Sequence, residues 1–163
     1  MCQGRQVRLA ELDPATDAGV AAELLALQRS AYAVEAALID DDRIPPLHES
    51  LAELRAAALW WLGAVTEERL VGAVAVRVED DGVDIDRLVV APDTHRRGVA
   101  SALVAAVLDR AAGRPTTVST GRDNRPARRL YEQLGFAPTG DVQVLPELWV
   151  TRFVHRGGQG ARS

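Results

Sequence analysis

Residues 89–103 have the sequence VVAPDTHRRGVASAL, which runs from an apolar strand through a proline turn and a basic glycine loop into a helix. The first turn of a helix carries backbone N–H groups without intrahelical acceptors, and the helix dipole adds positive potential there. Gly98 and Ala100 keep this turn free of bulky side chains, while Arg96 and Arg97 add positive charge. The segment predicts an anion-binding loop; a glycine that only makes a turn before an amphipathic helix is the alternative.

The composition is typical of one globular domain. The chain has 163 residues, of which 47% are apolar and 26% are charged, and it contains no long uncharged apolar run. We expect a single domain over residues 1–154 and a disordered tail, rich in glycine and arginine, over residues 155–163. No membrane span or secretory signal is predicted, and the cytoplasm is the expected compartment.

The charged and metal-binding residues exclude several classes of function. The net charge of −4 argues against nonspecific binding of nucleic acid, although the arginines of residues 122–129 suit a small polyanion. The nineteen basic residues are all arginines, which excludes a lysine Schiff base and the lysine of a Walker loop. Since the three histidines are scattered and Cys2 is the single cysteine, neither a metal site nor an internal disulfide is predicted.

Apolar periodicity and capping residues predict an alternating order of strands and helices. Strands are expected over residues 7–12, 60–66, 70–79, 83–91, 116–119, 137–145 and 148–154. Helices are expected over residues 16–34, 50–58, 97–112 and 124–135. The apolar stripe of the first helix is predicted to end at Val34. Residues 39–47 hold three aspartates and two prolines, which predicts an extended acidic loop that favours a cationic substrate if it lines a cleft.

Two separate motifs in this order resemble the GNAT superfamily of N-acyltransferases. The first is the family's (Gln/Arg)-x-x-Gly-x-(Gly/Ala) pyrophosphate loop, which stands here as HRRGVA at residues 95–100. The second motif is Asn124-x-x-Ala127-x-x-Leu130-Tyr131-x-x-x-Gly135-Phe136. The resemblance covers residues 60–154 well, whereas residues 13–58 match only in having two helices.

The resemblance implies an α/β fold of the α+β type. Its expected centre is a mixed, largely antiparallel sheet of six to seven strands, flanked by about four helices and splayed between the central strands. In this family the glycine loop binds the pyrophosphate of acetyl-CoA through main-chain amides, which correspond here to those of Arg96 to Ser101. His95 stands where the family has glutamine or arginine, so its side-chain contact is expected to be weaker or pH-dependent.

The resemblance also implies roles close to the thioester. Residues 88–90 are expected to pair with the pantetheine arm, with the Val90 N–H facing the thioester carbonyl. Tyr131 takes the position of a tyrosine that hydrogen-bonds the coenzyme sulfur, and Asn124 that of a pantetheine contact; packing behind Phe136 and helix capping are their structural alternatives. A phenol pKa of about 10 lies above a thiol pKa of about 8.5, which favours hydrogen bonding over complete proton transfer. The expected cofactor-binding residues are Leu88, Val89, Val90, His95, Arg96, Arg97, Gly98, Val99, Ala100, Ser101, Asn124 and Tyr131.

The acceptor side carries weaker signals. Asp86 occupies a strand position where several relatives have a glutamate that assists amine deprotonation, and its reference pKa of about 3.9 favours action through water or attraction of the cation. Asp84 is the alternative, and a salt bridge at the sheet edge is the competing use for both. Residues 32–61 are expected to shape the acceptor pocket without a readable motif. The candidate substrate residues there are Tyr32, Glu35 and Trp60, although core filling is favoured for the tryptophan.

Together these residues predict an acetyl-CoA-dependent N-acetyltransferase that moves an acetyl group to a primary amine in a ternary complex, since no covalent nucleophile is visible. Acetyl-CoA and an unidentified amine are the expected partners, without nucleic acid, membrane or metal, and a homodimer is an open alternative. A noncatalytic acyl-CoA-binding or sensing domain of the same fold is the rival function. A Rossmann-type nucleotide binder is a third reading, against which the missing G-x-G-x-x-G counts.

Overall fold

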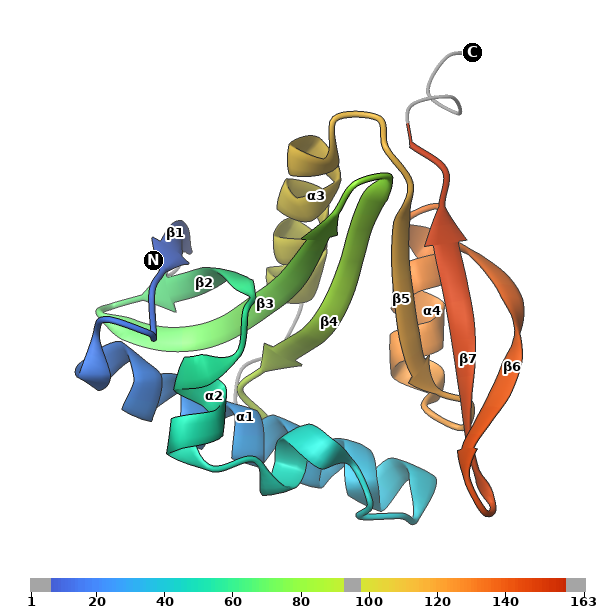
Figure 1. The fold of residues 1–163 in the computed structure, drawn as a ribbon, viewed down its shortest axis with the longest axis horizontal. Helices are drawn as coiled ribbons and strands as arrows, with labels where there is room; N and C mark the ends of the chain where they lie inside the picture. Colours follow the sequence, from blue (N-terminus) through green and yellow to red (C-terminus); the bar gives the residue numbers. More distant parts are fainter. Residues whose placement is uncertain (1–6, 93–97, 158–163) are drawn as a thin grey trace, which may run out of the picture.

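A seven-stranded sheet forms the centre of the molecule in the computed structural model, which describes residues 7–92 and 98–157 (Figure 1). The strand order is β1-β2-β3-β4-β5-β7-β6. The strands are β1 (Arg8–Leu12), β2 (Trp60–Thr66), β3 (Arg69–Glu79), β4 (Gly82–Val90), β5 (Thr116–Gly121), β6 (Ala137–Leu145) and β7 (Leu148–His155). Neighbouring strands are antiparallel except for the parallel pair β4 and β5. The predicted mixed, largely antiparallel sheet is therefore confirmed.

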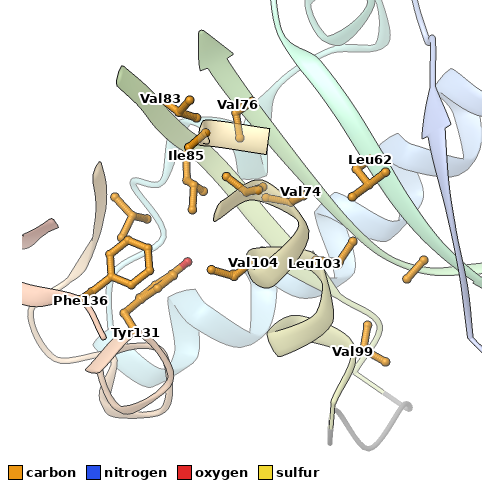
Figure 2. Packing of buried hydrophobic residues seen from close by; sticks show 14 of the residues in the cluster. Leu62, Val74, Val76, Val83, Ile85, Val99, Leu103, Val104, Tyr131 and Phe136 are labelled. Atoms are coloured by element: carbon orange, nitrogen blue, oxygen red, sulfur yellow. The ribbon is translucent and has the colours of Figure 1, made fainter. Parts of the chain in front are cut away.

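Helices cover both faces of this sheet. In the described part of the chain they are α1 (Ala18–Ile39), the 3-10 turn η1 (Pro45–His48), α2 (Leu51–Ala56), α3 (Val99–Ala111) and α4 (Arg125–Gln133). Helices α1 and α2 pack on one face around Leu24, Leu54 and Trp61. Helices α3 and α4 pack on the other face around Leu103 and Phe136 (Figure 2). None of these helices is long and apolar enough to cross a membrane.

Side-chain caps explain where three of the helices begin. The Asp17 carboxylate accepts a hydrogen bond of 3.1 Å from the Val20 N–H at the start of α1. Ser50 and Glu53 form a capping box at the start of α2. Asn124 caps α4, because its Oδ1 accepts from the Ala127 N–H at 3.2 Å. Each of these side chains satisfies N–H groups that the first helical turn leaves free.

Helix α1 is longer than predicted, and its buried stripe departs from the prediction toward its C-terminal end. The helix continues five residues beyond Val34, which is exposed rather than buried. The stripe instead passes through Gln28 and Tyr32, which are 1% and 8% exposed, toward Glu35 and Ile39 at helical spacings of three and four. A polar residue, Gln28, lies inside the stripe because it meets hydrogen-bonding partners there, which apolar periodicity does not predict.

A β-bulge at Asp86 reverses the side-chain alternation of β4. Arg87 and Ile85 pair with two consecutive residues of β3, so Asp86 has no partner in that strand. Ile85 packs in the core on the α3 side, whereas Arg87 donates a hydrogen bond to Gln28 of α1 on the opposite face. The bulge therefore turns a charged side chain into the interior beneath α1.

A gap opens between the central strands beyond this bulge. Strands β4 and β5 pair over three residues of each, 83–85 with 116–118, and then diverge (Figure 1). The predicted splay between the central strands is confirmed. Because the gap passes through the sheet, side chains from α1 on one face and α4 on the other approach each other within it.

The C-terminal strand ends later than predicted. β7 includes His155, whose ring lies 5.3 Å from the Phe136 ring in an edge-on contact. The Gly157 N–H donates to His155 Nδ1 at 3.1 Å. The predicted boundary between strand and tail therefore moves past residue 155, because His155 packs against the sheet. Residues 158–163 lie outside the described residues.

Candidate functional site

Two cavities meet at the gap between β4 and β5. The first, of about 470 Å³, lies between α1, the end of β4 and the N-termini of α3 and α4, and is called the α3 cavity below. The second, of about 430 Å³, lies between α1, η1, the gap and the β6–β7 hairpin, and is called the hairpin cavity. Both volumes suit small-molecule binding. The residues that line both cavities are Tyr32, Glu35, Leu88, Asn124 and Ala127.

The start of α3 forms an exposed cradle of backbone amides. Gly98 is the N-cap with φ 90°, and the Ala102 N–H donates to the Gly98 carbonyl at 2.9 Å. The amides of residues 99–101 precede this first helical bond and have no intrahelical acceptor. Among the described residues, a Cβ built on Gly98 would meet no atom within 4 Å, which leaves room for a phosphate beside these amides. The predicted contacts His95, Arg96 and Arg97 lie outside the described residues.

The edge of β4 presents free backbone groups toward the gap. The Ala91 N–H donates to the Val71 carbonyl of β3 at 2.8 Å. Since successive N–H groups of a strand point to opposite sides, the N–H groups of Val90 and Leu88 point away from β3 and into the gap. Residues 88–90 also line the α3 cavity. An extended ligand chain therefore has backbone partners here, as the resemblance implied.

Tyr131 reaches the gap from α4. Its side chain is 3% exposed, and its ring lies 5.4 Å from the Phe136 ring and 6.0 Å from the Phe153 ring. Figure 2 shows Tyr131 beside Phe136. It also lines the hairpin cavity. Burial, and then the charge of Glu35, raises the pKa of Tyr131, so the phenol keeps its proton at neutral pH. Tyr131 therefore packs against Phe136, as the structural alternative proposed, and it also lines the hairpin cavity.

Glu35 lies across the gap from Tyr131, on the α1 side. Its carboxylate is half-buried at the junction of the two cavities. Burial raises the pKa of Glu35, although hydrogen bonds with the Asn124 side chain and the Gly121 backbone oppose the rise. Tyr32 precedes it by one turn of α1 and is buried, and burial followed by the charge of Glu35 raises the pKa of Tyr32. The predicted Tyr32, Glu35, Asn124 and Tyr131 are therefore brought together.

Asp86 lines the hairpin cavity but is held by two arginines. Its Oδ2 accepts from Arg87 Nε at 2.7 Å, and its Oδ1 lies 3.4 Å from Arg77 Nη2. Asp84 pairs with Arg77 at 3.8 Å and accepts from the Thr117 hydroxyl at 2.6 Å, outside both cavities. Asp86 and Asp84 therefore both form salt bridges, which was the alternative to a functional role for each.

Sequence reasoning missed the most deeply buried charge of the site, Arg87. The residue is 8% exposed and donates from Nη1 to Gln28 Oε1 at 2.9 Å and to Glu49 Oε1 at 2.7 Å. Burial alone would lower the pKa of Arg87, but the hydrogen bonds to Glu49 and Asp86 raise it overall. This network joins α1 and the segment before α2 to β4. An arginine in an apolar strand was the available signal, but the bulge that buries it leaves no sequence pattern.

Trp60 lies away from the two cavities. Its side chain packs against the core on the α3 side, with the Arg110 guanidinium 4.2 Å from the ring centre. Its Nε1 donates to the Glu11 carboxylate. The residue lines neither cavity, because its position in β2 directs it to the face opposite α1. The prediction that Trp60 contacts the substrate is therefore corrected. The alternative prediction, that Trp60 fills the core, agrees with its position.

The acidic loop contributes its apolar half to the hairpin cavity. Arg43, Ile44 and the two prolines of η1 line the cavity, whereas the three aspartates, residues 40–42, lie around a separate hollow. Arg43 pairs with Asp41 at 2.7 Å and donates to the Pro146 carbonyl of the β6–β7 hairpin at 2.8 Å. The loop therefore closes one side of the cavity without supplying the acidic lining that its sequence suggested.

Comparison with known proteins places this geometry in a family. Residues 22–136 match the model of the Acetyltransferase (GNAT) family. Over 138 residues, 84% of this chain, the sequence is 33% identical to the UPF0157 protein YqkA of Bacillus subtilis. Over 131 residues, 78% of this chain, it is 35% identical to a mycothiol acetyltransferase of Clavibacter sepedonicus. The matches span about 40% of the length of each of these two curated relatives.

Solved structures share the fold at low sequence identity. The ribosomal-protein-S18-alanine N-acetyltransferase of Escherichia coli matches with a TM-score of 0.74 and 15% identity over 97% of this chain and 99% of that one. The yncA acetyltransferase of Salmonella typhimurium, solved with its cofactor acetyl-CoA, matches with a TM-score of 0.64 and 19% identity over 95% and 96%. The family-model match, with the splayed central strands and the bare amide cradle at α3, establishes that this chain belongs to the GNAT acetyltransferase family.

Proposed function

We propose that this protein transfers an acetyl group from acetyl-CoA to a primary amine by direct attack in a ternary complex. One observation carries the proposal: the two cavities share lining residues at the gap, Glu35 among them, while Val90 lines the α3 cavity and Tyr131 lines the hairpin cavity. One cavity ends at a helix N-terminus suited to phosphate, and the other is closed by α1 and the β6–β7 hairpin. Two ligands that enter from opposite sides therefore meet at the gap.

The residues present fit acetyl-CoA, which supplies the activated acetyl group as a thioester. The amides of residues 99–101 would hold the pyrophosphate, with help from the predicted Arg96 and Arg97. The free edge of β4 at residues 88–90 would hold the pantetheine amides, and the Val90 N–H would polarise the thioester carbonyl. Homologues of this family bind acetyl-CoA. In this arrangement the acetyl carbon would lie beside the hairpin cavity.

Glu35, Asp86 and Tyr131 are assigned to proton transfer and to the stabilisation of charge. An alkyl ammonium has a pKa near 10, so the acceptor must lose one proton before its nitrogen attacks the acetyl carbon. A bond then forms between nitrogen and carbon and the carbon–sulfur bond breaks. The nitrogen loses its second proton, the departing thiolate gains one, and the coenzyme leaves as a thiol. We assign Glu35 to accept the ammonium proton. Asp86 pairs with Arg77 and Arg87, and we assign it to neutralise these arginines so that their charge does not repel the cation. Tyr131 would donate a hydrogen bond to the departing sulfur.

The Tyr131→Phe variant tests the tyrosine. Its turnover is expected to fall about 10- to 100-fold, because a hydrogen bond to a charged atom contributes about 1.5–3 kcal/mol. The acetyl-CoA affinity and the unfolding midpoint should stay near the parent values, since phenylalanine keeps the ring contacts with Phe136 and Phe153. Steady-state kinetics and calorimetry measure both quantities. Unchanged turnover would leave Tyr131 with a packing role alone.

The Glu35→Gln variant tests the proton acceptor. Burial raises the pKa of Glu35 above the usual pKa of a glutamate side chain. In the parent protein, kcat/KM should therefore rise with pH until the Glu35 carboxyl is ionised, and then level off. The variant should lose this acid limb and fall about 30-fold at the plateau. This is less than the roughly 100-fold typical of a general base, because water in the cavity takes over part of the transfer.

Stability gives a second measurement for the same variant. A raised folded-state pKa means that Glu35 contributes stability below its unfolded pKa, and that this contribution disappears as pH rises through the folded pKa. Glutamine stays neutral, so Glu35→Gln should unfold at a higher temperature than the parent near pH 7 and show a flatter pH dependence. Asp86→Asn is the comparison variant, which should lower kcat/KM while keeping the acid limb. An acid limb that survives in Glu35→Gln would contradict the assignment.

Thiol release tests the function as a whole. The purified chain with acetyl-CoA is offered a broad panel of primary amines, and free thiol and acetylated product are measured by absorbance and mass spectrometry. Amine-dependent release of thiol with equal formation of amide supports the transferase. Tight acetyl-CoA binding without turnover across the panel would instead indicate a noncatalytic sensing domain.

A further inference from the structure

The lining of the hairpin cavity separates into a polar end and an apolar end. The polar end lies at the gap, where Tyr32, Glu35, Asn124 and Tyr131 gather. The other polar and charged lining residues are Arg43, Asp86, Arg87, Ser119 and Thr120. Apolar side chains from three separate segments form a wall of the cavity. They are Ile39 of α1, Ile44 before η1, and Val144, Leu145, Leu148 and Val150 of the β6–β7 hairpin. A molecule in this cavity therefore meets one site for a charged group and an extended apolar wall.

The other charges along the cavity are already neutralised by the protein. Arg43 holds Asp41 at 2.7 Å, and Arg87 holds Asp86 and Glu49 at 2.7 Å each. Within residues 7–92 and 98–157, no arginine or histidine forms an ion pair with Glu35. Glu35 is thus the carboxylate that remains available to a ligand cation.

These two observations restrict the class of acceptor, given the function proposed above. A second ammonium would enter the apolar wall, where a charge without a partner is strongly disfavoured. A carboxylate would need a free guanidinium, but both cavity arginines already hold carboxylates. A sugar would lose hydrogen bonds to water along the apolar wall without replacement. We propose that the acceptor is a monoamine with an apolar body, an alkylamine or arylalkylamine, whose nitrogen lies at Glu35 and whose body lies against Ile44 and the β6–β7 hairpin.

Length-matched acceptors test this class directly. Hexylamine, 1,6-diaminohexane and 6-aminohexanoate share one carbon chain and differ at its far end, and glucosamine represents polar amines. We expect kcat/KM for hexylamine to exceed that for each of the other three at least tenfold. From butylamine to hexylamine, kcat/KM should rise about fourfold per methylene, because burying one CH₂ contributes about 0.8 kcal/mol. Equal or higher kcat/KM with the diamine, the amino acid or glucosamine would overturn the class.

A charge placed on the apolar wall provides the complementary variant. Leu145 is 41% exposed on the hairpin and lines the cavity, so Leu145→Asp should fold and raise the ratio of kcat/KM for 1,6-diaminohexane to that for hexylamine about tenfold. Val142 is similarly exposed on the same strand but lines neither cavity, so Val142→Asp is the matched control and should leave the ratio unchanged. A ratio that moves equally in both variants would contradict the placement of the apolar body.

Binding without turnover separates this inference from the proposed function. Calorimetry of hexylamine and 1,6-diaminohexane is performed on the protein saturated with coenzyme A. Hexylamine that binds at least tenfold more tightly than the diamine supports the acceptor class, even if no acetyl transfer follows and the transferase proposal fails. Efficient acetylation of polar amines with weak hexylamine binding would retain the transferase and overturn the acceptor class. Absence of hexylamine binding also overturns it.

Discussion

Replacement of Gly98 by valine is expected to weaken acetyl-CoA binding about 100-fold or more. The residue is the N-cap of α3, and no atom of the described residues lies within 4 Å of a Cβ built there. A valine there would hold the pyrophosphate away from these amides. Each hydrogen bond to a charged group contributes about 1.5–3 kcal/mol, so losing two of them accounts for the expected decrease. Calorimetric titration with acetyl-CoA measures it.

Gly113→Val provides a control on the same helix. Gly113 follows the C-terminal end of α3 with φ 89°, against 90° at Gly98, and a Cβ there also meets no atom of the described residues within 4 Å. A β-branched residue is strained at both positions, so both variants should lose a similar amount of stability. Only Gly98→Val should lose acetyl-CoA affinity. Affinity close to the parent in Gly98→Val, or an equal loss in Gly113→Val, would refute the amide cradle.

Replacement of Arg87 by methionine is expected to destabilise the fold by about 3–5 kcal/mol, the range typical of breaking a buried ion pair. The guanidinium is surrounded by Gln28, Glu49 and Asp86 and is 8% exposed. Its removal leaves the Glu49 carboxylate without its cation and separates η1 and α1 from β4. Urea denaturation followed by circular dichroism measures the free energy of unfolding.

Two further variants distinguish this network from general loss of an arginine. Arg77 lies on the neighbouring strand and also pairs with Asp86, but its side chain is 50% exposed, so Arg77→Met should lower stability by less than about 1 kcal/mol. Glu49→Met in the Arg87→Met background should restore part of the loss, because no unpaired carboxylate then remains at Glu49. Equal losses in Arg77→Met and Arg87→Met would contradict the role of burial.

Local patterns in the sequence predicted most elements of this fold. Valine-rich alternation identified β2, β3 and β4, and the capping residues Ser50 and Asn124 located the starts of α2 and α4. The glycine loop with the motif at residues 124–136 indicated the family and the splay. These signals succeed because propensity, capping and periodicity depend on neighbours within one or two turns. The boundaries of α1 and β7 were missed because contacts with distant residues extend both elements.

Some features of the functional site follow from local sequence, and others depend on the tertiary structure. The sequence by itself predicted the anion-binding loop at Gly98, because residue type and spacing carry that information. The resemblance to the family implied the roles of Tyr131 and Asp86, and Glu35 was a candidate through its place in the segment expected to shape the acceptor pocket. Tertiary structure alone decided that the Asp86 bulge turns Arg87 inward, that Trp60 faces away, and that the β6–β7 hairpin supplies an apolar wall. The pairing of β4 with β3, and of each strand with the helix above it, sets those directions. Such pairings join residues far apart in the chain, which no local pattern encodes.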